Sequence, residues 1–157
     1  MGLVINDHPD LAQKLGADLC HLGQEDFFDA GWTAASQLPS LLGLSTHAPA
    51  QAGRSLAARP AYLAIGPVYA TPTKASAKPV TLDYVRWGAA HVSIPWFAIG
   101  GINLSNLDDV LQAGATRICA VSAILNAPDP AAACRQFKRR LEASLLQSAD
   151  RLNSAKG

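Results

Sequence analysis

Short apolar runs alternate along the chain with longer stretches in which apolar residues recur at helical spacing. The short runs predict buried strands, which we expect at residues 3–5, 19–22, 42–44, 62–65, 96–99 and 117–121. Helical spacing is found over residues 9–15, 31–38, 48–58, 81–92 and 107–112, and from 130 toward 151. The chain therefore predicts about six strands, each followed by a helix.

Capping residues indicate where several of these helices begin. Thr81 is predicted to cap the helix that follows it, and either Asn103 or Ser105 to cap the helix over 107–112. Asp129 followed by Pro130 is typical of an N-cap and a first helical position.

Strands that alternate with amphipathic helices indicate parallel pairing with right-handed crossovers. Two architectures fit this order, a doubly wound open sheet and a (β/α) barrel. An open sheet concentrates its site at one switch point, whereas a barrel uses the ends of many strands. Polar residues here follow several strands, at Asn6-Asp7, Gln24–Asp26, Ser45, Thr71–Lys74, Gly100-Gly101 and Ser122. We therefore expect an α/β fold of the TIM (β/α)8-barrel type, with residues 1–157 forming one domain.

The loop that begins at Gly66 carries two hydroxyl groups and a cation. Thr71 and Thr73 flank a proline, and Lys74 follows them. Small donors and an ammonium group at the carboxyl end of a strand favour an anion site, most plausibly for phosphate. The alternative is that the T-P-T segment is a rigid turn and Lys74 a solvated surface charge.

Asp7 and Asp26 close two successive predicted strands. In a barrel their carboxylates would face one another across the mouth, and two hard oxygen ligands suit Mg²⁺ bridged to a diphosphate. The alternative is that Asp7 caps the following helix and Asp26 caps its own turn.

Gly100-Gly101 and Val121-Ser122 end the last two predicted strands. Barrels commonly bind phosphate between the loops of their last two strands, at exposed N–H groups. The alternative is a plain turn glycine and a capping serine. Because both features occur in consecutive units, we favour phosphate.

Two histidines differ in their expected roles. His47 lies just beyond Ser45, where it could donate or accept a proton near neutral pH. His21 lies within an apolar run and is expected to be a core residue rather than a ligand. No Ser-His-Asp or Cys-His order stands out.

Composition limits the classes of function. The chain has 157 residues, of which 49% are hydrophobic and 16% are charged, which suits one domain with a substantial core. The net charge of +1 gives no case for nucleic acid or a membrane surface as a partner, and no membrane span or signal segment is expected. Cys20, Cys119 and Cys134 lack the spacing of a disulfide framework or a zinc site. A reducing cytoplasm is the expected setting.

Six short motifs resemble those of thiamine-phosphate synthase in order and spacing. They are N-D at Asn6-Asp7, H-L-G-Q-E-D at His21–Asp26, L-G-L-S-T-H at Leu42–His47, G-P-V-Y-A-T-P-T-K at Gly66–Lys74, A-I-G-G-I at Ala98–Ile102 and V-S-A-I at Val121–Ile124. The resemblance extends along nearly the whole chain, and six linked motifs are a specific signal where any one alone is not.

The resemblance implies a TIM-barrel transferase of thiamine biosynthesis, which joins the pyrimidine and thiazole halves of thiamine. Diphosphate leaves the hydroxymethylpyrimidine, and the thiazole nitrogen captures the resulting cation. By motif, the Mg²⁺ ligands are Asp7 and Asp26. The pyrimidine diphosphate is bound by Asn6, Ser45 and Lys74, of which Ser45 and Lys74 are the expected catalytic residues. The thiazole phosphate is bound by Thr71, Thr73, Gly101, Val121 and Ser122.

The chain also departs from the family pattern. The family has eight strands, whereas this chain begins at what looks like the third and lacks the Q-x-R-x-K segment that binds the pyrimidine diphosphate. Thr81 stands where the family usually has glycine. We therefore expect an N-terminally truncated barrel of about six βα units, whose bare edge strands at 3–5 and 117–121 invite self-association or an N-terminal partner. Alone, the chain is expected to be weakly active or inactive.

Two other functions remain open. The thiazole tautomerases share this barrel and place a histidine after the strand that carries Ser45, a role that His47 fits. Tautomerisation needs neither the Mg²⁺ carboxylates nor Lys74, so replacing Asp7 by Ala should stop a synthase and leave a tautomerase working. A non-catalytic phosphate-binding or partner-binding remnant is the second alternative.

Overall fold

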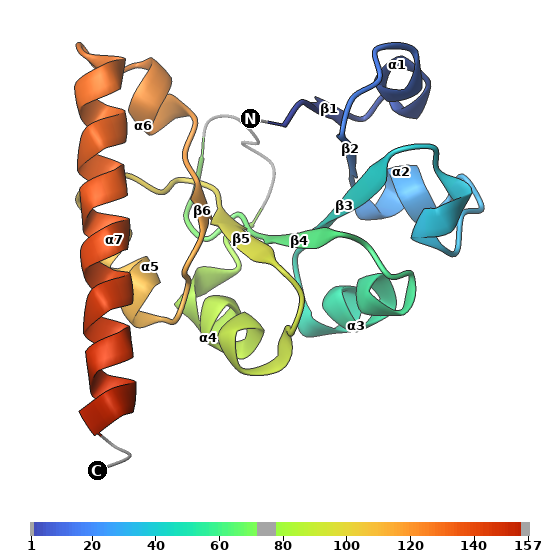
Figure 1. Ribbon diagram of the computed structural model, residues 1–157. Helices are drawn as coiled ribbons and strands as arrows, with labels where there is room; N and C mark the ends of the chain where they lie inside the picture. The colour runs from blue at the N-terminus through green and yellow to red at the C-terminus, as the bar shows by residue number, and fades with distance from the viewer. Residues whose placement is uncertain (1, 72–77, 155–157) are drawn as a thin grey trace.

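Six parallel strands follow one another across a single curled sheet, in chain order (Figure 1). The computed structural model describes residues 2–71 and 78–154. The strands are β1 (Val4–Asn6), β2 (Leu19–Leu22), β3 (Leu41–Thr46), β4 (Tyr62–Ile65), β5 (Trp96–Ile99) and β6 (Ile118–Cys119). The strand order never reverses, whereas a doubly wound sheet has a switch point where the order reverses. The predicted parallel α/β barrel arrangement is confirmed over six units.

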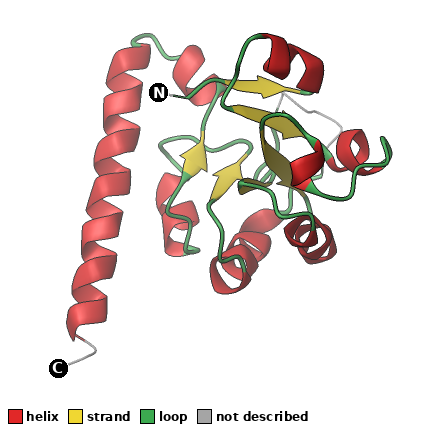
Figure 2. Ribbon diagram, turned by 45° about the vertical axis from the view of Figure 1, so that its right-hand side comes forward, coloured by secondary structure: helices red, strands yellow, loops and turns green. Residues whose placement is uncertain are grey.

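Helices connect the strands and cover the convex side of the sheet (Figure 2). They are α1 (Pro9–Lys14), α2 (Gln24–Phe28), α3 (Pro49–Ala57), α4 (Thr81–His91), α5 (Leu107–Gln112), α6 (Ser122–Leu125) and α7 (Pro130–Ser154), with a 3₁₀ turn at Ala35–Gln37. In the part of the chain that the structure describes, no helix is both long enough and apolar enough to cross a membrane.

The two faces of the sheet differ in their surroundings. Because side chains alternate along a strand, every second residue faces the helices and enters the core. This buried set includes Leu22, Leu42, Leu44, Leu63 and Ile65. The intervening residues face the concave side, where the strand register places one row at the same level, Asn6, His21, Gly43 and Tyr62.

The outermost strands leave the curled sheet open. Within residues 2–71 and 78–154, β1 and β6 each pair with a single neighbour, β2 and β5 respectively. Both predicted bare edges are therefore present, although β6 spans two residues instead of the expected 117–121. The next residues turn away from the strand direction because they enter the short helix α6, which the apolar pattern did not predict.

The prediction of a helix over residues 31–38 is wrong. The helix after β2 begins immediately, at Gln24, where the Gly23 N–H donates to Asp26 Oδ2 at 3.1 Å and closes the first turn. Phe27 is fully buried in this helix, so packing stabilises it. The later segment holds only the 3₁₀ turn.

The predicted helix caps are partly confirmed. Asp129 caps α7, because its Oδ1 accepts a hydrogen bond of 2.9 Å from the Ala132 N–H. The N-cap of α5 is Asn106, instead of Asn103 or Ser105. The Asn103 side chain is engaged earlier, since its Oδ1 accepts from the Ser105 N–H at 2.8 Å and forms a local turn. Thr81 is the first residue of α4 rather than its cap.

Replacing Thr81 by Gly is expected to stabilise the protein by about 1 kcal/mol. Thr81 has φ 63°, a left-handed conformation that a β-branched side chain disfavours. Urea unfolding measures the change. Thr81→Ala is the matched control, because it keeps Cβ and loses the hydroxyl that lies 3.4 Å from the Asp83 N–H. A gain in the alanine variant as large as in the glycine variant would contradict relief of backbone strain.

Candidate active site

A cavity of about 140 Å³ lies at the carboxyl ends of β3 to β6. Four of the five residues predicted to bind a phosphate on the thiazole side line it, namely Thr71, Gly101, Val121 and Ser122. Thr73 and Lys74 lie outside the described residues. His47, Gly66 and Pro67 complete the wall on the β3 and β4 side. The fold therefore brings together motifs that are distant in the sequence.

Gly101 allows the loops after β4 and β5 to touch. Its φ is +64°, and a Cβ there would lie 2.6 Å from the Ala70 carbonyl oxygen and 2.8 Å from Tyr69 Cβ. Hydrogen bonds join the same loops, from the Val68 N–H to the Ile99 carbonyl at 2.8 Å and from the Tyr69 N–H to the Gly100 carbonyl at 3.1 Å. These contacts hold two walls of the cavity together.

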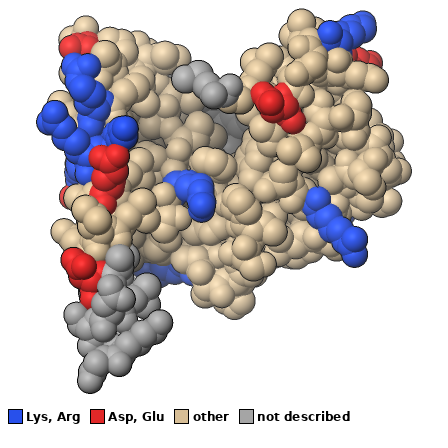
Figure 3. Space-filling model, in the orientation of Figure 1, with Lys and Arg blue, Asp and Glu red and all other residues tan. Residues whose placement is uncertain are grey.

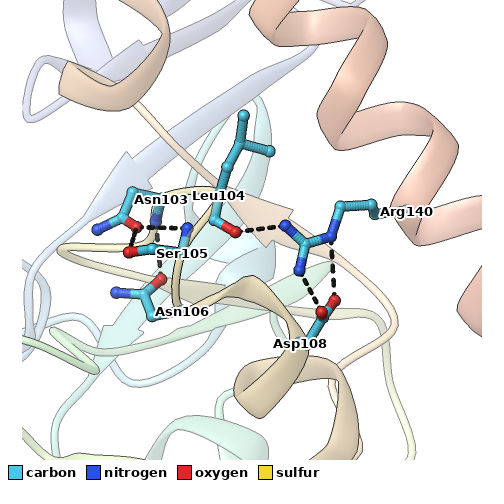
Figure 4. Close-up of polar contacts among 6 residues, drawn as sticks. All are labelled: Asn103, Leu104, Ser105, Asn106, Asp108 and Arg140. Atoms are coloured by element: carbon cyan, nitrogen blue, oxygen red, sulfur yellow. Dashed lines mark hydrogen bonds and ion pairs between the residues drawn. The ribbon is translucent and has the colours of Figure 1, made fainter.

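Helix α7 contacts the loop that follows β5 through Arg140, which bonds to Leu104 and Asp108 (Figure 4). Asn106 Nδ2 donates to the Gly101 carbonyl at 3.0 Å, and Asn106 Oδ1 accepts from the Asn103 N–H at 2.8 Å. Arg140 of α7 donates to the Leu104 carbonyl and forms an ion pair with Asp108, with a 3.0 Å bond from Nε to Oδ1. The long terminal helix thus supports a loop of the site.

His47 is held in one tautomer. Its Nδ1 contacts the Gly66 carbonyl oxygen, and its main-chain N–H donates to Gln51 Oε1 at 2.7 Å. A carbonyl oxygen only accepts hydrogen bonds, so the proton of the neutral ring resides on Nδ1. Nε2 is then the basic nitrogen of a side chain that lines the cavity.

Ser45 is held on the concave face by its neighbours. Its Oγ lies 2.9 Å from His21 Nε2, and its carbonyl oxygen accepts from Gln24 Nε2 at 2.7 Å. His21 Nδ1 lies 2.8 Å from the Tyr62 hydroxyl. The prediction that His21 is a core residue is therefore wrong. Strand alternation was the signal that could have identified its position, because Cys20 and Leu22 fill the core and His21 must face the other way.

Burial controls the ionisation of the groups on this face. It raises the pKa of Tyr62 to about 12, and the Cys119 and Cys20 thiols act in the same direction. Burial also raises the pKa of Cys119. Both groups therefore keep their protons at neutral pH.

A larger cavity of about 610 Å³ occupies the concave side of the sheet. Apolar side chains such as Val4 and Phe97 line most of it, and Asn6, His21 and Tyr62 supply polar atoms. Figure 3 shows the molecule hollowed between the side that carries α6 and α7 and the side that carries α1. An apolar hollow with a few polar groups is the usual form of a small-molecule site.

Asp7 and Asp26 follow the neighbouring strands β1 and β2, and both are engaged locally. Asp7 Oδ2 accepts from Asn6 Nδ2 at 2.6 Å, and Asp26 Oδ2 accepts the Gly23 N–H. The alternative prediction that Asp26 closes its own turn is thus confirmed. The alternative prediction for Asp7, that it caps the following helix, is wrong. The N-cap of α1 is His8, and the His8 side chain makes no capping hydrogen bond.

The donor chemistry at this edge fits Mg²⁺ held jointly with a phosphate ligand. Across residues 2–71 and 78–154, no group of three or more His, Cys, Asp or Glu side chains is placed to hold a metal by itself. Mg²⁺ usually takes one or two carboxylates and completes its shell with water and substrate phosphates. Asp7 directly follows β1 and Asp26 lies in the first turn of α2, and these two exposed aspartates supply carboxylates of the kind that Mg²⁺ requires.

Comparison with known proteins agrees with this geometry. The TMP-TENI family model, described as thiamine monophosphate synthase, matches residues 1–124. The thiamine-phosphate synthase of Thermus thermophilus is 51% identical over 138 residues, which cover 87% of this chain and 66% of that protein. The Gloeobacter violaceus thiamine-phosphate synthase is 49% identical over 138 residues, 88% of this chain and 40% of that protein. The chain thus spans less than two thirds of the length of either relative.

A solved structure shares the architecture. The thiamine phosphate pyrophosphorylase from Pyrococcus furiosus superposes with a TM-score of 0.75 at 27% identity, covering 90% of this chain and 68% of that chain. Six curled strands with helices outside therefore correspond to consecutive units of a closely similar barrel.

Proposed function

The chain belongs to the thiamine monophosphate synthase family, and from this premise we propose that it couples hydroxymethylpyrimidine diphosphate to thiazole phosphate. The products are thiamine phosphate and diphosphate. The observation that carries the proposal is the cavity at the carboxyl ends of β3 to β6, because its lining comes from four separate motifs, represented by His47, Thr71, Gly101 and Ser122.

The thiazole phosphate binds in this smaller cavity. The Thr71 and Ser122 hydroxyls and the main-chain N–H groups near Gly101 and Val121 supply donors for phosphate oxygens. Thr73 adds a further hydroxyl from the same loop. Because Asn106 bonds to the Gly101 carbonyl and Arg140 of α7 bonds to Leu104 in the same loop, the donors keep their positions before the ligand arrives, which lowers the ordering cost of binding.

The pyrimidine diphosphate binds beside it, along the rim of the larger cavity. Asn6 and Ser45 act as polar contacts there, and the Lys74 ammonium pairs with the departing diphosphate. Asp7 and Asp26 hold Mg²⁺, which when bound neutralises charge on the leaving group. The apolar concave wall gives the pyrimidine ring a surface from which its binding displaces water, and the thiazole nitrogen captures the pyrimidine cation. The main task of the protein is to align the two substrates and stabilise the departing charge.

The setting that suits this function is a reducing cytoplasm with small molecules as partners. Cys20, Cys119 and Cys134 are free thiols. Disulfides are characteristic of oxidising compartments, so three unpaired cysteines support the cytoplasmic assignment.

The direct test is a coupled assay with both substrates and Mg²⁺, together with calorimetry for each substrate alone. We expect slow formation of thiamine phosphate and diphosphate in equal amounts, in line with the weak activity expected of a barrel with six βα units, and we expect EDTA to abolish formation of both. We also expect thiazole phosphate to bind without metal. Failure of the chain to bind either substrate and to form product would overturn the proposal, whereas binding without turnover would identify a non-catalytic remnant.

One observation favours a second candidate, an isomerase acting on the thiazole phosphate. His47 lines the cavity with its ring fixed so that Nε2 is basic, and a basic nitrogen can move a proton on a bound thiazole. Incubation of a thiazole phosphate tautomer without diphosphate substrate or Mg²⁺ separates the two functions. Isomerisation under those conditions would support the isomerase, and its absence with active coupling would support the synthase.

A further inference from the structure

Polar contacts link Tyr62, His21 and Ser45 into a chain on the concave face of β2, β3 and β4. The Tyr62 hydroxyl lies 2.8 Å from His21 Nδ1, and His21 Nε2 lies 2.9 Å from Ser45 Oγ. We propose that Tyr62 and His21 are positioning residues, which hold the Ser45 hydroxyl so that its proton points to the diphosphate of the substrate. The choice of ligand rests on the proposed function, whereas the direction of the hydrogen bonds does not.

Only two directions of hydrogen bonding are possible for a neutral His21. In the first, the Tyr62 O–H donates to Nδ1 and the Nε2–H donates to Ser45 Oγ. In the second, Nδ1–H donates to the phenol oxygen and the Ser45 O–H donates to Nε2. The first direction leaves the serine proton available for a ligand, whereas the second presents only serine lone pairs to an anion.

The surroundings of Tyr62 favour the first direction. The ring stacks on His21 with centroids 5.5 Å apart and meets Phe97 edge to face at 5.3 Å. It also lies across Gly43, where a Cβ would overlap the ring. Tyr62 is half-buried, and the hydroxyl of a protonated phenol usually donates to an acceptor within reach; His21 Nδ1 is the acceptor that this geometry supplies.

Neighbouring residues hold Ser45 and Tyr62 in place, so the direction of the Ser45 hydroxyl proton is fixed. The Ser45 backbone is tied to Gln24, whose Nε2 donates to the Ser45 carbonyl at 2.7 Å and to Ser55 Oγ at 2.8 Å. Tyr62 is fixed by its two ring contacts. A donor that is already oriented toward the developing charge costs no reorganisation during the reaction.

The first test reads the His21 tautomer without any ligand. Ring ¹⁵N shifts at a pH well above the ordinary imidazole pKa of about 6.5 distinguish a protonated nitrogen from a bare one. We expect Nε2 protonated and Nδ1 bare in the unaltered protein, and a mixture of tautomers in Tyr62→Phe, which keeps the ring and removes the hydroxyl. A protonated Nδ1 in the unaltered protein would overturn the proposal.

Tyr84→Phe is the matched control for that measurement. Tyr84 is a buried tyrosine, and its hydroxyl lies 2.8 Å from Thr46 Oγ1 and 3.0 Å from the Ala48 carbonyl oxygen, among the helices rather than on the concave face. This variant also loses a hydrogen-bonded phenol hydroxyl and should leave the His21 ¹⁵N shifts unchanged.

The second test is a double-mutant cycle on the affinity for inorganic diphosphate with Mg²⁺, measured by calorimetry. Tyr62→Phe is expected to weaken binding about tenfold. In a Ser45→Ala background the same change should alter affinity by less than about twofold, because Tyr62 acts through the serine hydroxyl. Equal losses in both backgrounds would show that Tyr62 does not act through Ser45.

Failure of the proposed function can be told apart from failure of this inference. If the unaltered protein binds no diphosphate, the proposed substrate is wrong and the orientation of Ser45 toward it is overturned as well. The ¹⁵N shifts would still establish whether the hydrogen bonds run from Tyr62 to Ser45. If diphosphate binds and the cycle is additive, the function stands and the positioning role does not.

Discussion

Replacing Asp26 by Asn is expected to lower thiamine phosphate formation by about a hundredfold or more, because it removes a charge that holds Mg²⁺ near the leaving diphosphate. The substitution separates this role from the structural one. Asp26 Oδ2 accepts the Gly23 N–H at 3.1 Å at the start of α2, and the amide oxygen of asparagine accepts the same bond. Asp7→Asn should have the same effect, because Asn6 Nδ2 donates to a single oxygen of Asp7, Oδ2, and an asparagine amide oxygen at position 7 can accept that bond while the charge is lost.

Glu25→Gln is the control for charge. Glu25 is exposed, lies in the same turn of α2, and is not part of the proposed metal site. Initial rates over a range of Mg²⁺ concentrations and the thermal unfolding midpoint should be measured for each variant. We expect Glu25→Gln to retain activity and all three variants to unfold near the unaltered protein. Equal rates of thiamine phosphate formation in Asp26→Asn and the unaltered chain would refute the metal assignment.

Replacing Gly101 by Ala is expected to reduce the free energy of unfolding by about 2–4 kcal/mol and to abolish thiazole phosphate binding. At φ +64° any side chain is strained, and the new Cβ would lie 2.6 Å from the Ala70 carbonyl oxygen. Both obstacles involve backbone, so no side-chain rotation relieves them. The loops after β4 and β5 must separate, and they form opposite walls of the cavity.

Gly53→Ala is the control, and its expected effect on the free energy of unfolding has the opposite sign. Gly53 lies inside α3, and a Cβ there would meet nothing within 4 Å. Alanine should therefore stabilise the helix by about 0.5–1 kcal/mol and leave thiazole phosphate binding unchanged. Urea unfolding and calorimetry provide the comparison. If both glycine variants proved neutral, the close approach of the two loops would be disproved.

Several elements could be read from the sequence because their causes are local. The apolar runs predicted β4 at Tyr62–Ile65 and β5 at Trp96–Ile99 at their observed bounds, and the alanine-rich stretch predicted α3 within a residue or two. An apolar run ended by glycine or proline restricts the backbone whatever surrounds it. The order of strands and helices then required parallel pairing.

Other elements depended on contacts that no local pattern contains. Helix α2 begins at Gln24 because Phe27 is buried and Asp26 closes the first turn, although the apolar spacing favoured a later helix. His21 was assigned to the core from its apolar neighbours, although strand alternation places it on the concave face; only the assembled sheet brings it beside Ser45 and Tyr62. The support that Arg140 gives to the Gly101 loop likewise had no signal in the sequence.

The sequence alone therefore determined which residue types stand at the ends of the strands, through motifs that keep their order along the chain. Only the tertiary structure decided which of them share a cavity, because proximity across a sheet depends on its curl and register. Thr71 and Ser122 line the same cavity although they lie far apart in sequence. Hydrophobic patterning places side chains on one face or the other, but distances between strand ends arise only once the strands have paired and the sheet has curled.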